Sequence, residues 1–150
     1  MSIDNNLYEK SIKILTDLIA FKTISGQDNS NLIDYCEKIL NNIGIDTFKV
    51  YDDDKKRVNL FGTLKAKNQS IKKPIILSGH TDVVPVSKGW SSDPFVATIK
   101  NDKLYGRGSC DMKGFIACTL AYAPIFKESN LNRDLHFCYT FFGQSLRQPV

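Results

Sequence analysis

No stretch of this sequence approaches the ~20 consecutive apolar residues that a membrane-spanning helix needs, so we expect no membrane-embedded segment. The lysines are scattered among acidic residues and form no basic block, which leaves only a net charge of +4 in favour of a nucleic-acid partner. We therefore expect no nucleic acid to bind. The first ten residues, MSIDNNLYEK, lack a basic stretch followed by an apolar one, so we expect no signal peptide and a cytoplasmic location.

Closely spaced cysteines are also missing. No two of the four cysteines show the two-residue spacing that is typical of zinc and redox motifs: Cys36, Cys110, Cys118 and Cys138. Their apolar surroundings predict free, mostly buried thiols in a reducing compartment. Cys110 directly precedes Asp111, so a role as a metal ligand stays open for it, although zinc cysteines usually come in closely spaced sets.

The composition is that of a folded domain, with 42% hydrophobic and 24% charged residues in a chain of 150. Apolar residues recur with helical spacing over residues 7–21 and again after Ser30, where Gly44 is the predicted stop. A third helix is predicted over residues 112–123, with Asp111 as its cap and Pro124 near its end.

Strand-like stretches make up much of the rest of the chain, and Asn101-Asp102 supplies a hairpin turn between two of them. They cover residues 45–51, 58–64, 75–84, 95–100, 103–107 and 135–142. Helices between apolar strands predict an α/β fold with a mixed, mostly parallel sheet flanked by helices. In such sheets, ligands bind beyond the carboxyl ends of the strands.

The stretch SGHTDVVPV, residues 78–86, ends an apolar strand with a histidine and a carboxylate. His80 and Asp82 are two positions apart, so their side chains point to the same side of an extended segment. Imidazole and carboxylate groups are zinc ligands, but Asp82 is too close to His80 in the chain to bind the same ion easily. We predict instead that Asp82 accepts the second ring N–H of His80 and orients the imidazole.

A second candidate, Asp111, follows the glycine-rich stretch LYGRGSC at another predicted strand end. Its two carboxylate oxygens can bridge two metal ions, and the neighbouring glycines allow close backbone approach: Gly106, Gly108 and Gly114. Each candidate also has an ordinary structural explanation. A histidine at a strand end is commonly a surface or core residue, and an aspartate before a helix is commonly a cap. His136 is such a histidine, with no partner visible in the sequence.

Three phrases decide between these interpretations. In this order and spacing, SGHTDVVPV, GWSSDPF and LYGRGSCDMKGF resemble the di-zinc amidohydrolase family of acetylornithine deacetylase, succinyl-diaminopimelate desuccinylase, aminoacylase and carboxypeptidase G2. LTDLIAFKTIS and VNLFGTL fit the same family, so the resemblance covers residues 7–141. WSSDPF and CDMKGF are most similar to acetylornithine deacetylase.

The resemblance implies a metal-dependent enzyme in which His80 ligates one zinc ion, Asp111 bridges two, and Asp82 serves catalysis by orienting His80. It also implies a cis Asp111–Met112 peptide, cobalt as a possible substitute metal and a homodimer. The implied reaction is hydrolysis of a small N-acylated amino acid, N-acetyl-L-ornithine to L-ornithine and acetate, in arginine biosynthesis. In the reaction that the resemblance implies, the two ions would activate water and polarise the amide carbonyl.

The family pattern also calls for an acidic pair after the last predicted strand, yet the sequence has no Asp or Glu after Asp134. We therefore expect residues 1–150 to be the amino-terminal part of an incomplete zinc-hydrolase catalytic domain, truncated or changed in reading frame near Phe142. Such a fragment lacks the dimerisation domain and is expected to be inactive alone. The alternatives are another deacylase or peptidase of the family, such as succinyl-diaminopimelate desuccinylase, and a non-catalytic binding fragment.

Overall fold

A computed structural model describes residues 5–67 and 72–141 of the protein. The change in sequence character expected after Phe142 lies outside these residues. The main elements in chain order are α1 (Asn5–Ala20), α2 (Ser30–Asn42), β1 (Asp46–Tyr51), β2 (Val58–Leu64), β3 (Ile75–His80), β4 (Thr98–Lys100), β5 (Lys103–Tyr105), α3 (Gly114–Glu128) and β6 (Leu135–Thr140). A short irregular turn, Ser109–Lys113, precedes α3.

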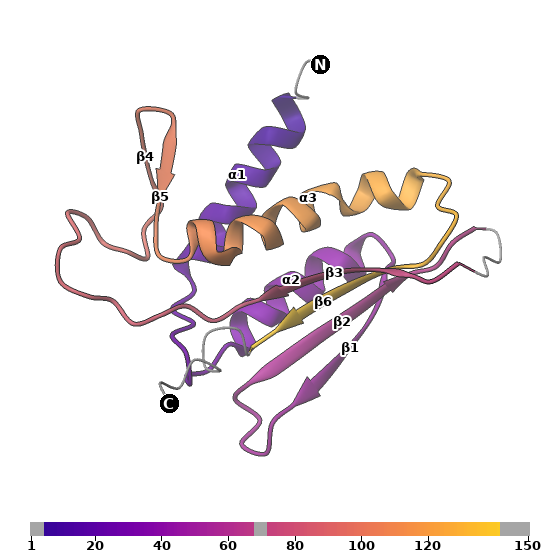
Figure 1. Ribbon diagram of the computed structural model, residues 1–150, viewed down its shortest axis with the longest axis horizontal. Coiled ribbons are helices and arrows are strands. Elements are labelled where there is room, and N and C mark those ends of the chain that lie inside the picture. The colour runs from indigo at the N-terminus through magenta and orange to yellow at the C-terminus, as the bar shows by residue number, and fades with distance from the viewer. Residues whose placement is uncertain (1–4, 68–71, 142–150) are drawn as a thin grey trace.

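Four of the strands form one sheet in the order β1-β2-β6-β3, and β4 and β5 form a separate hairpin away from it (Figure 1). The α/β fold with a mixed sheet is confirmed. Within the described part of the chain, however, β1 with β2 and β2 with β6 pair antiparallel, and β3 with β6 pairs parallel. The expectation of a mostly parallel sheet is therefore wrong for these four strands, because β1 and β2 form a hairpin that adds to the sheet through β6.

Helices α2 and α3 cover one face of the sheet. Helix α1 packs against α3, on the side of α3 that faces away from the sheet (Figure 1). A Cβ at Gly62 in β2 would lie 3.1 Å from Leu40 of α2, and one at Gly79 in β3 would lie 3.2 Å from Ile116 of α3. Between these glycines, Tyr139 of β6 bonds Thr119 of α3, with 2.7 Å between the two hydroxyl oxygens. The core therefore lies between this face and the helices.

The first two helices are confirmed, although α1 starts at Asn5 and ends at Ala20 instead of covering residues 7–21. The stop predicted at Gly44 agrees with its φ of 67°. The third helix differs. It begins at Gly114, so Asp111 does not cap it, and it continues through Pro124 to Glu128. Proline removes only one backbone donor near the helix end, and buried Ala123 keeps this last part packed on the core.

The cysteines are free, as predicted, but only Cys36 is buried. Cys110 and Cys118 are exposed, and Cys138 is half-buried on the sheet face opposite the helices. None of the helices within residues 5–67 and 72–141 has the length and apolar character needed to cross a membrane.

Candidate functional site

His80 is the last residue of β3, at the carboxyl end of the parallel pair that this strand forms with β6. Its register partner is Thr140. One residue later, the N–H of Thr81 donates to the carbonyl oxygen of Thr140 at 2.7 Å, and its hydroxyl donates to the same oxygen at 3.1 Å. These two hydrogen bonds hold the end of β3 against β6 and so place the imidazole at the edge of the sheet.

β3 ends at His80, earlier than the predicted end at Val84. After the bonds of Thr81 to Thr140, the following residues bond instead to the connection between α1 and α2. The N–H of Val83 donates to the carbonyl oxygen of Thr23, and the N–H of Ser25 donates to that of Val83, both at 2.9 Å. This short parallel bridge replaces the pairing with β6 and turns Asp82 inward, so that only 2% of Asp82 is exposed.

Asp82 faces the imidazole of His80 with two acceptors. The Nδ1 atom of His80 lies 3.2 Å from Oδ1 of Asp82 and 3.1 Å from the carbonyl oxygen of the same residue. Because the carbonyl oxygen can only accept, Nδ1 must carry the hydrogen in this arrangement. The lone pair of a neutral imidazole is then on Nε2, the atom that faces away from Asp82.

Asp111 approaches His80 from a different part of the chain. Its Oδ1 atom lies 3.1 Å from Nε2 of His80, although the two residues are 31 positions apart. The Asp111 side chain is 70% exposed, whereas that of His80 is 14% exposed. The structure thus brings the three predicted site residues together in the order Asp82, His80, Asp111, and their chemical roles stay predictions.

The turn that carries Asp111 is held by its backbone and by close contacts. The Asp111–Met112 peptide is cis, as expected. Gly108 has φ 79°, and a Cβ there would lie 2.5 Å from a methyl carbon of Val83. A Cβ at Gly114 would lie 2.5 Å from the carbonyl oxygen of Ser109. Glycine is therefore required on both sides of Asp111, which agrees with the close backbone approach that the sequence predicted.

Lys113 joins the same turn to α1. Its side chain is fully buried, and its Nζ atom donates to the carbonyl oxygens of Leu18 at 2.8 Å and Phe21 at 2.7 Å. Burial lowers the pKa of the Lys113 ammonium from the ordinary lysine value of 10.5 to about 8, because the charged form is poorly solvated there. Lys113 thus fixes the turn to the carboxyl end of α1.

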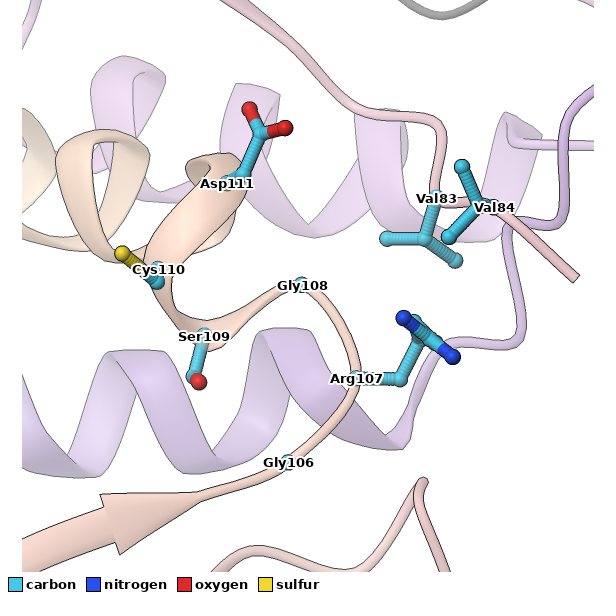
Figure 2. Close-up of a pocket in the computed structure, with 8 residues that line it drawn as sticks. All are labelled: Val83, Val84, Gly106, Arg107, Gly108, Ser109, Cys110 and Asp111. Carbon is cyan, nitrogen blue, oxygen red and sulfur yellow. The ribbon is translucent and has the colours of Figure 1, made fainter. Parts of the chain in front are cut away.

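A pocket of about 220 Å³ opens beside Asp111. Figure 2 shows it between Val83 and Val84 on one side and the loop from Gly106 to Asp111 on the other. Arg107 reaches across this space. Its guanidinium lies 5.1 Å from the centre of the Trp90 ring, and its terminal nitrogen donates to the carbonyl oxygen of Pro85 at 3.3 Å. Arg107 therefore ties the GWSSDPF stretch to the loop that carries Asp111.

The donor set suits part of a zinc site. An imidazole nitrogen and a carboxylate oxygen face each other, and the second ring nitrogen is held by a buried carboxylate, the arrangement common around zinc-binding histidines. No cluster of three or more His, Cys, Asp or Glu that could hold a metal occurs within residues 5–67 and 72–141. The second histidine does not contribute, since Nδ1 of His136 lies 3.0 Å from the hydroxyl of Thr63.

Sequence reasoning missed three residues that support the site: Ser25, Arg107 and Lys113. All three stand inside the family phrases named above, but nothing in their local pattern indicates a contact with distant residues. Lys113 has one further signal, because it is a lysine within the apolar start of a predicted helix. His136, interpreted from the sequence as an ordinary strand histidine, lies in β6 and pairs with the hydroxyl of Thr63, a partner that the sequence did not reveal.

Comparison with known proteins gives matches over most of the chain. Residues 76–142 match the model of peptidase family M20/M25/M40. A succinyl-diaminopimelate desuccinylase from Rickettsia akari is 38% identical over 79% of this chain and 32% of its own length. An acetylornithine deacetylase from Myxococcus xanthus is 40% identical over 71% of this chain and 28% of its own length. The chain spans about a third of the length of these relatives.

Two solved structures share the fold. Human carnosine dipeptidase 1 matches 95% of this chain and 33% of its own, with a TM-score of 0.77 and 21% identity. An M20 family metallo-carboxypeptidase from Sulfolobus solfataricus matches 87% of this chain and 30% of its own, with a TM-score of 0.73 and 24% identity. The fold is thus one found in metallopeptidases. This agrees with the similarity of residues 76–142 to peptidase family M20/M25/M40.

Proposed function

We propose that this chain contributes one side of the metal centre of a hydrolase that cleaves the amide bond of small N-acylated amino acids. The observation that carries the proposal is the placement of His80 between two carboxylates. The Nδ1 atom of His80 lies 3.2 Å from Oδ1 of buried Asp82, and its Nε2 atom lies 3.1 Å from Oδ1 of exposed Asp111. Histidines that bind a metal ion commonly donate the other ring N–H to a carboxylate or a carbonyl oxygen, as His80 does here, and the Asp111 oxygen would be a second ligand.

His80 and Asp111 would hold zinc, with cobalt as a substitute, and the two oxygens of Asp111 would allow it to serve two ions. When bound, zinc would supply Lewis-acid activation of the amide carbonyl and of water. Asp82 keeps the hydrogen of the imidazole on Nδ1 and prevents the ring from turning. Lys113 and the flanking glycines keep the Asp111 turn against the strand end, so the two ligands stay in register.

For the substrate, we propose N-acetyl-L-ornithine, which would place the whole protein in arginine biosynthesis as a cytoplasmic enzyme. The support is the WSSDPF and CDMKGF phrases and the acetylornithine deacetylase relative. Deacylation of N-succinyl-diaminopimelate is the alternative within the same reaction class, because relatives named succinyl-diaminopimelate desuccinylase match 79% and 81% of the chain, against 71% for the acetylornithine deacetylase. Assays of both substrates with a chain extended to the length of the relatives would separate the two activities.

The domain assignment is a proposal of the same kind: residues 1–150 would form the amino-terminal part of the catalytic domain. Hydrolysis also needs a general base, and no Asp or Glu follows Asp134 in this sequence. We therefore expect residues 1–150 alone to release no measurable ornithine from N-acetyl-L-ornithine. Zinc-dependent release that His80→Ala abolishes would contradict this expectation. If a chain extended to the length of the relatives also binds zinc and turns over no substrate, the second candidate, a non-catalytic binding fragment, gains support.

The metal site itself is tested by isothermal titration of the reduced chain with zinc. We expect weak binding that is lost in both His80→Ala and Asp111→Ala, because each substitution removes one of two facing donors. His136→Ala is the matched control, since it removes the other histidine at a distance from the site. Equal binding by the unmodified chain and by both ligand variants would refute the proposed metal centre.

A further inference from the structure

Ser25 contacts Asp82, the most buried of the three candidate site residues. Its hydroxyl donates to Oδ2 of Asp82 at 2.6 Å, across a separation of 57 positions in the sequence. Oδ1, the other oxygen of the same carboxylate, faces Nδ1 of His80 at 3.2 Å. Asp82 therefore divides its two oxygens between a hydroxyl from the α1–α2 connection and the imidazole at the end of β3.

The connection that carries Ser25 is itself firmly held. The hydroxyl of Thr23, which is only 3% exposed, donates to the carbonyl oxygen of Thr81 at 2.6 Å. The side-chain amide of buried Asn29 donates to the hydroxyl of Thr81 and to the carbonyl oxygen of Val58, both at 2.9 Å. With the backbone bridge between Ser25 and Val83, these contacts leave the serine hydroxyl little freedom to move away from Asp82.

A carboxylate can rotate about its last side-chain bond, and this rotation decides which oxygen meets the imidazole. A strong donor on Oδ2 resists the rotation, because turning the group would break a short hydrogen bond in a site from which water is largely excluded. The 2% exposure of Asp82 makes that loss costly, since little solvent is available to replace the serine hydroxyl.

We propose that Ser25 is a positioning residue for the metal site: it fixes the Asp82 carboxylate so that Oδ1 holds the hydrogen on Nδ1 of His80 and leaves Nε2 available to a metal ion. This inference rests on the proposed function, because Ser25 acts only through Asp82 and His80. The order of contacts is Ser25, Asp82, His80 and then the ion.

A purely structural role is the competing explanation. The Ser25 hydroxyl also lies 3.3 Å from the carbonyl oxygen of Val83, so it contributes to the bridge that joins the two segments. Thr23 provides a matched control, because its hydroxyl donates to the carbonyl oxygen of Thr81 in the same bridge, and no hydrogen bond joins its side chain to Asp82. If only the bridge matters, Thr23→Val must disturb the site at least as much as Ser25→Ala.

The test uses the reduced 150-residue chain with two readouts. The first is the ¹⁵N spectrum of the His80 ring without metal, recorded under identical conditions for every variant, which reports the share of the tautomer with hydrogen on Nδ1. The second is the zinc dissociation constant from titration. Substitutions around metal ligands typically cost about 10–100-fold in affinity, and we expect about tenfold for Ser25→Ala because Ser25 is one bond further out.

We expect Ser25→Ala to lower the share of the Nδ1–H tautomer and to weaken zinc binding, while Ser25→Thr, which keeps the hydroxyl, restores both. Thr23→Val should leave the tautomer ratio unchanged. If Ser25→Ala does not fold, as judged by circular dichroism, Ser25→Cys replaces it, because a thiol is a much weaker donor of similar size.

The results separate this inference from the proposed function. Zinc binding that depends on His80 but is unaffected by Ser25→Ala, with an unchanged ring spectrum, overturns the role of Ser25 alone. An equal effect of Thr23→Val and Ser25→Ala on the tautomer ratio overturns it too, because the bridge then explains the effect. Zinc binding that survives His80→Ala refutes the proposed function, and the ring spectrum still reports whether Ser25 positions Asp82.

Discussion

Lys113 and Lys127, near the two ends of α3, perform the same task for two different helices. Lys113 donates to the carbonyl oxygens of Leu18 and Phe21 at the end of α1, and Lys127 donates to those of Ile43 and Gly44 at the end of α2. Helix ends leave carbonyl oxygens without backbone partners, and a cation there also suits the helix dipole. One helix thus holds the carboxyl ends of the other two.

The two lysines should differ in their effect on stability. We expect Lys113→Ala to lower the free energy of unfolding by about 3 kcal/mol, because two buried carbonyl oxygens lose their donor and a space is left in the core. Lys127→Ala should cost only about 1 kcal/mol, because water can replace the lost donor at this half-buried position. Urea unfolding of both variants measures the difference, and equal losses would contradict it.

Thiol reactivity should distinguish buried Cys36 from the exposed cysteines. Burial raises the pKa of the Cys36 thiol above its ordinary value of 9.0, so this thiol stays protonated and unreactive. With iodoacetamide at pH 8, we expect rapid modification of exposed Cys110 and Cys118, and none of Cys36 until the chain is unfolded in urea. Mass spectrometry of the digested protein locates the modified residues, and early labelling of Cys36 would contradict its burial.

The raised pKa of the Cys36 thiol should also make the free energy of unfolding depend on pH. Above about pH 9 the unfolded chain releases the Cys36 proton while the folded protein keeps it, so the free energy of unfolding falls as the pH rises. Cys36→Ala should therefore flatten this part of the profile, although it lowers stability at neutral pH by leaving a small space. Denaturation curves of the two proteins from pH 7 to pH 10 provide the comparison. Parallel profiles would show that Cys36 titrates normally in the folded state.

Asp82→Asn should weaken zinc binding by about 10–100-fold while most of the fold is retained. The amide has nearly the same size, but it is a poorer, uncharged acceptor for the Nδ1–H of His80. The same substitution at exposed Asp93, whose carboxylate accepts the backbone N–H of Phe95, serves as the control. Unchanged zinc affinity in Asp82→Asn would argue against its orienting role.

Removal of metal should hardly change thermal stability. Two ligands are fewer than the three or four protein ligands that zinc sites generally use, so binding is expected to be weak. At a zinc concentration equal to the dissociation constant, binding adds only about 0.4 kcal/mol. Thermal unfolding with zinc and with a mild chelator should therefore give nearly the same midpoint. A shift of more than about 5 °C would indicate further ligands.

The first two helices, β2 and the hairpin turn at Asn101-Asp102 could be predicted from the sequence because their signals are local. Helical spacing and a glycine stop act within a few residues, and both turn residues have the positive φ that such a hairpin requires, 51° and 56°. The pairing of His80 with Asp82 is local in the same sense, because alternation along a strand puts both side chains on one side.

Only the tertiary structure decided where β3 ends, how the strands pair and what supports the site. The strand stops at His80 because the next residues bond to the segment around Thr23 and Ser25, which lies more than fifty positions earlier. Lys113 is buried because the carboxyl end of α1, where Leu18 accepts a hydrogen bond from its ammonium, packs against it. Sequence alone determined which chemical groups are available and their local geometry. Packing of distant segments determined which of them meet, because such contacts depend on the whole core and leave no periodic signal in the chain.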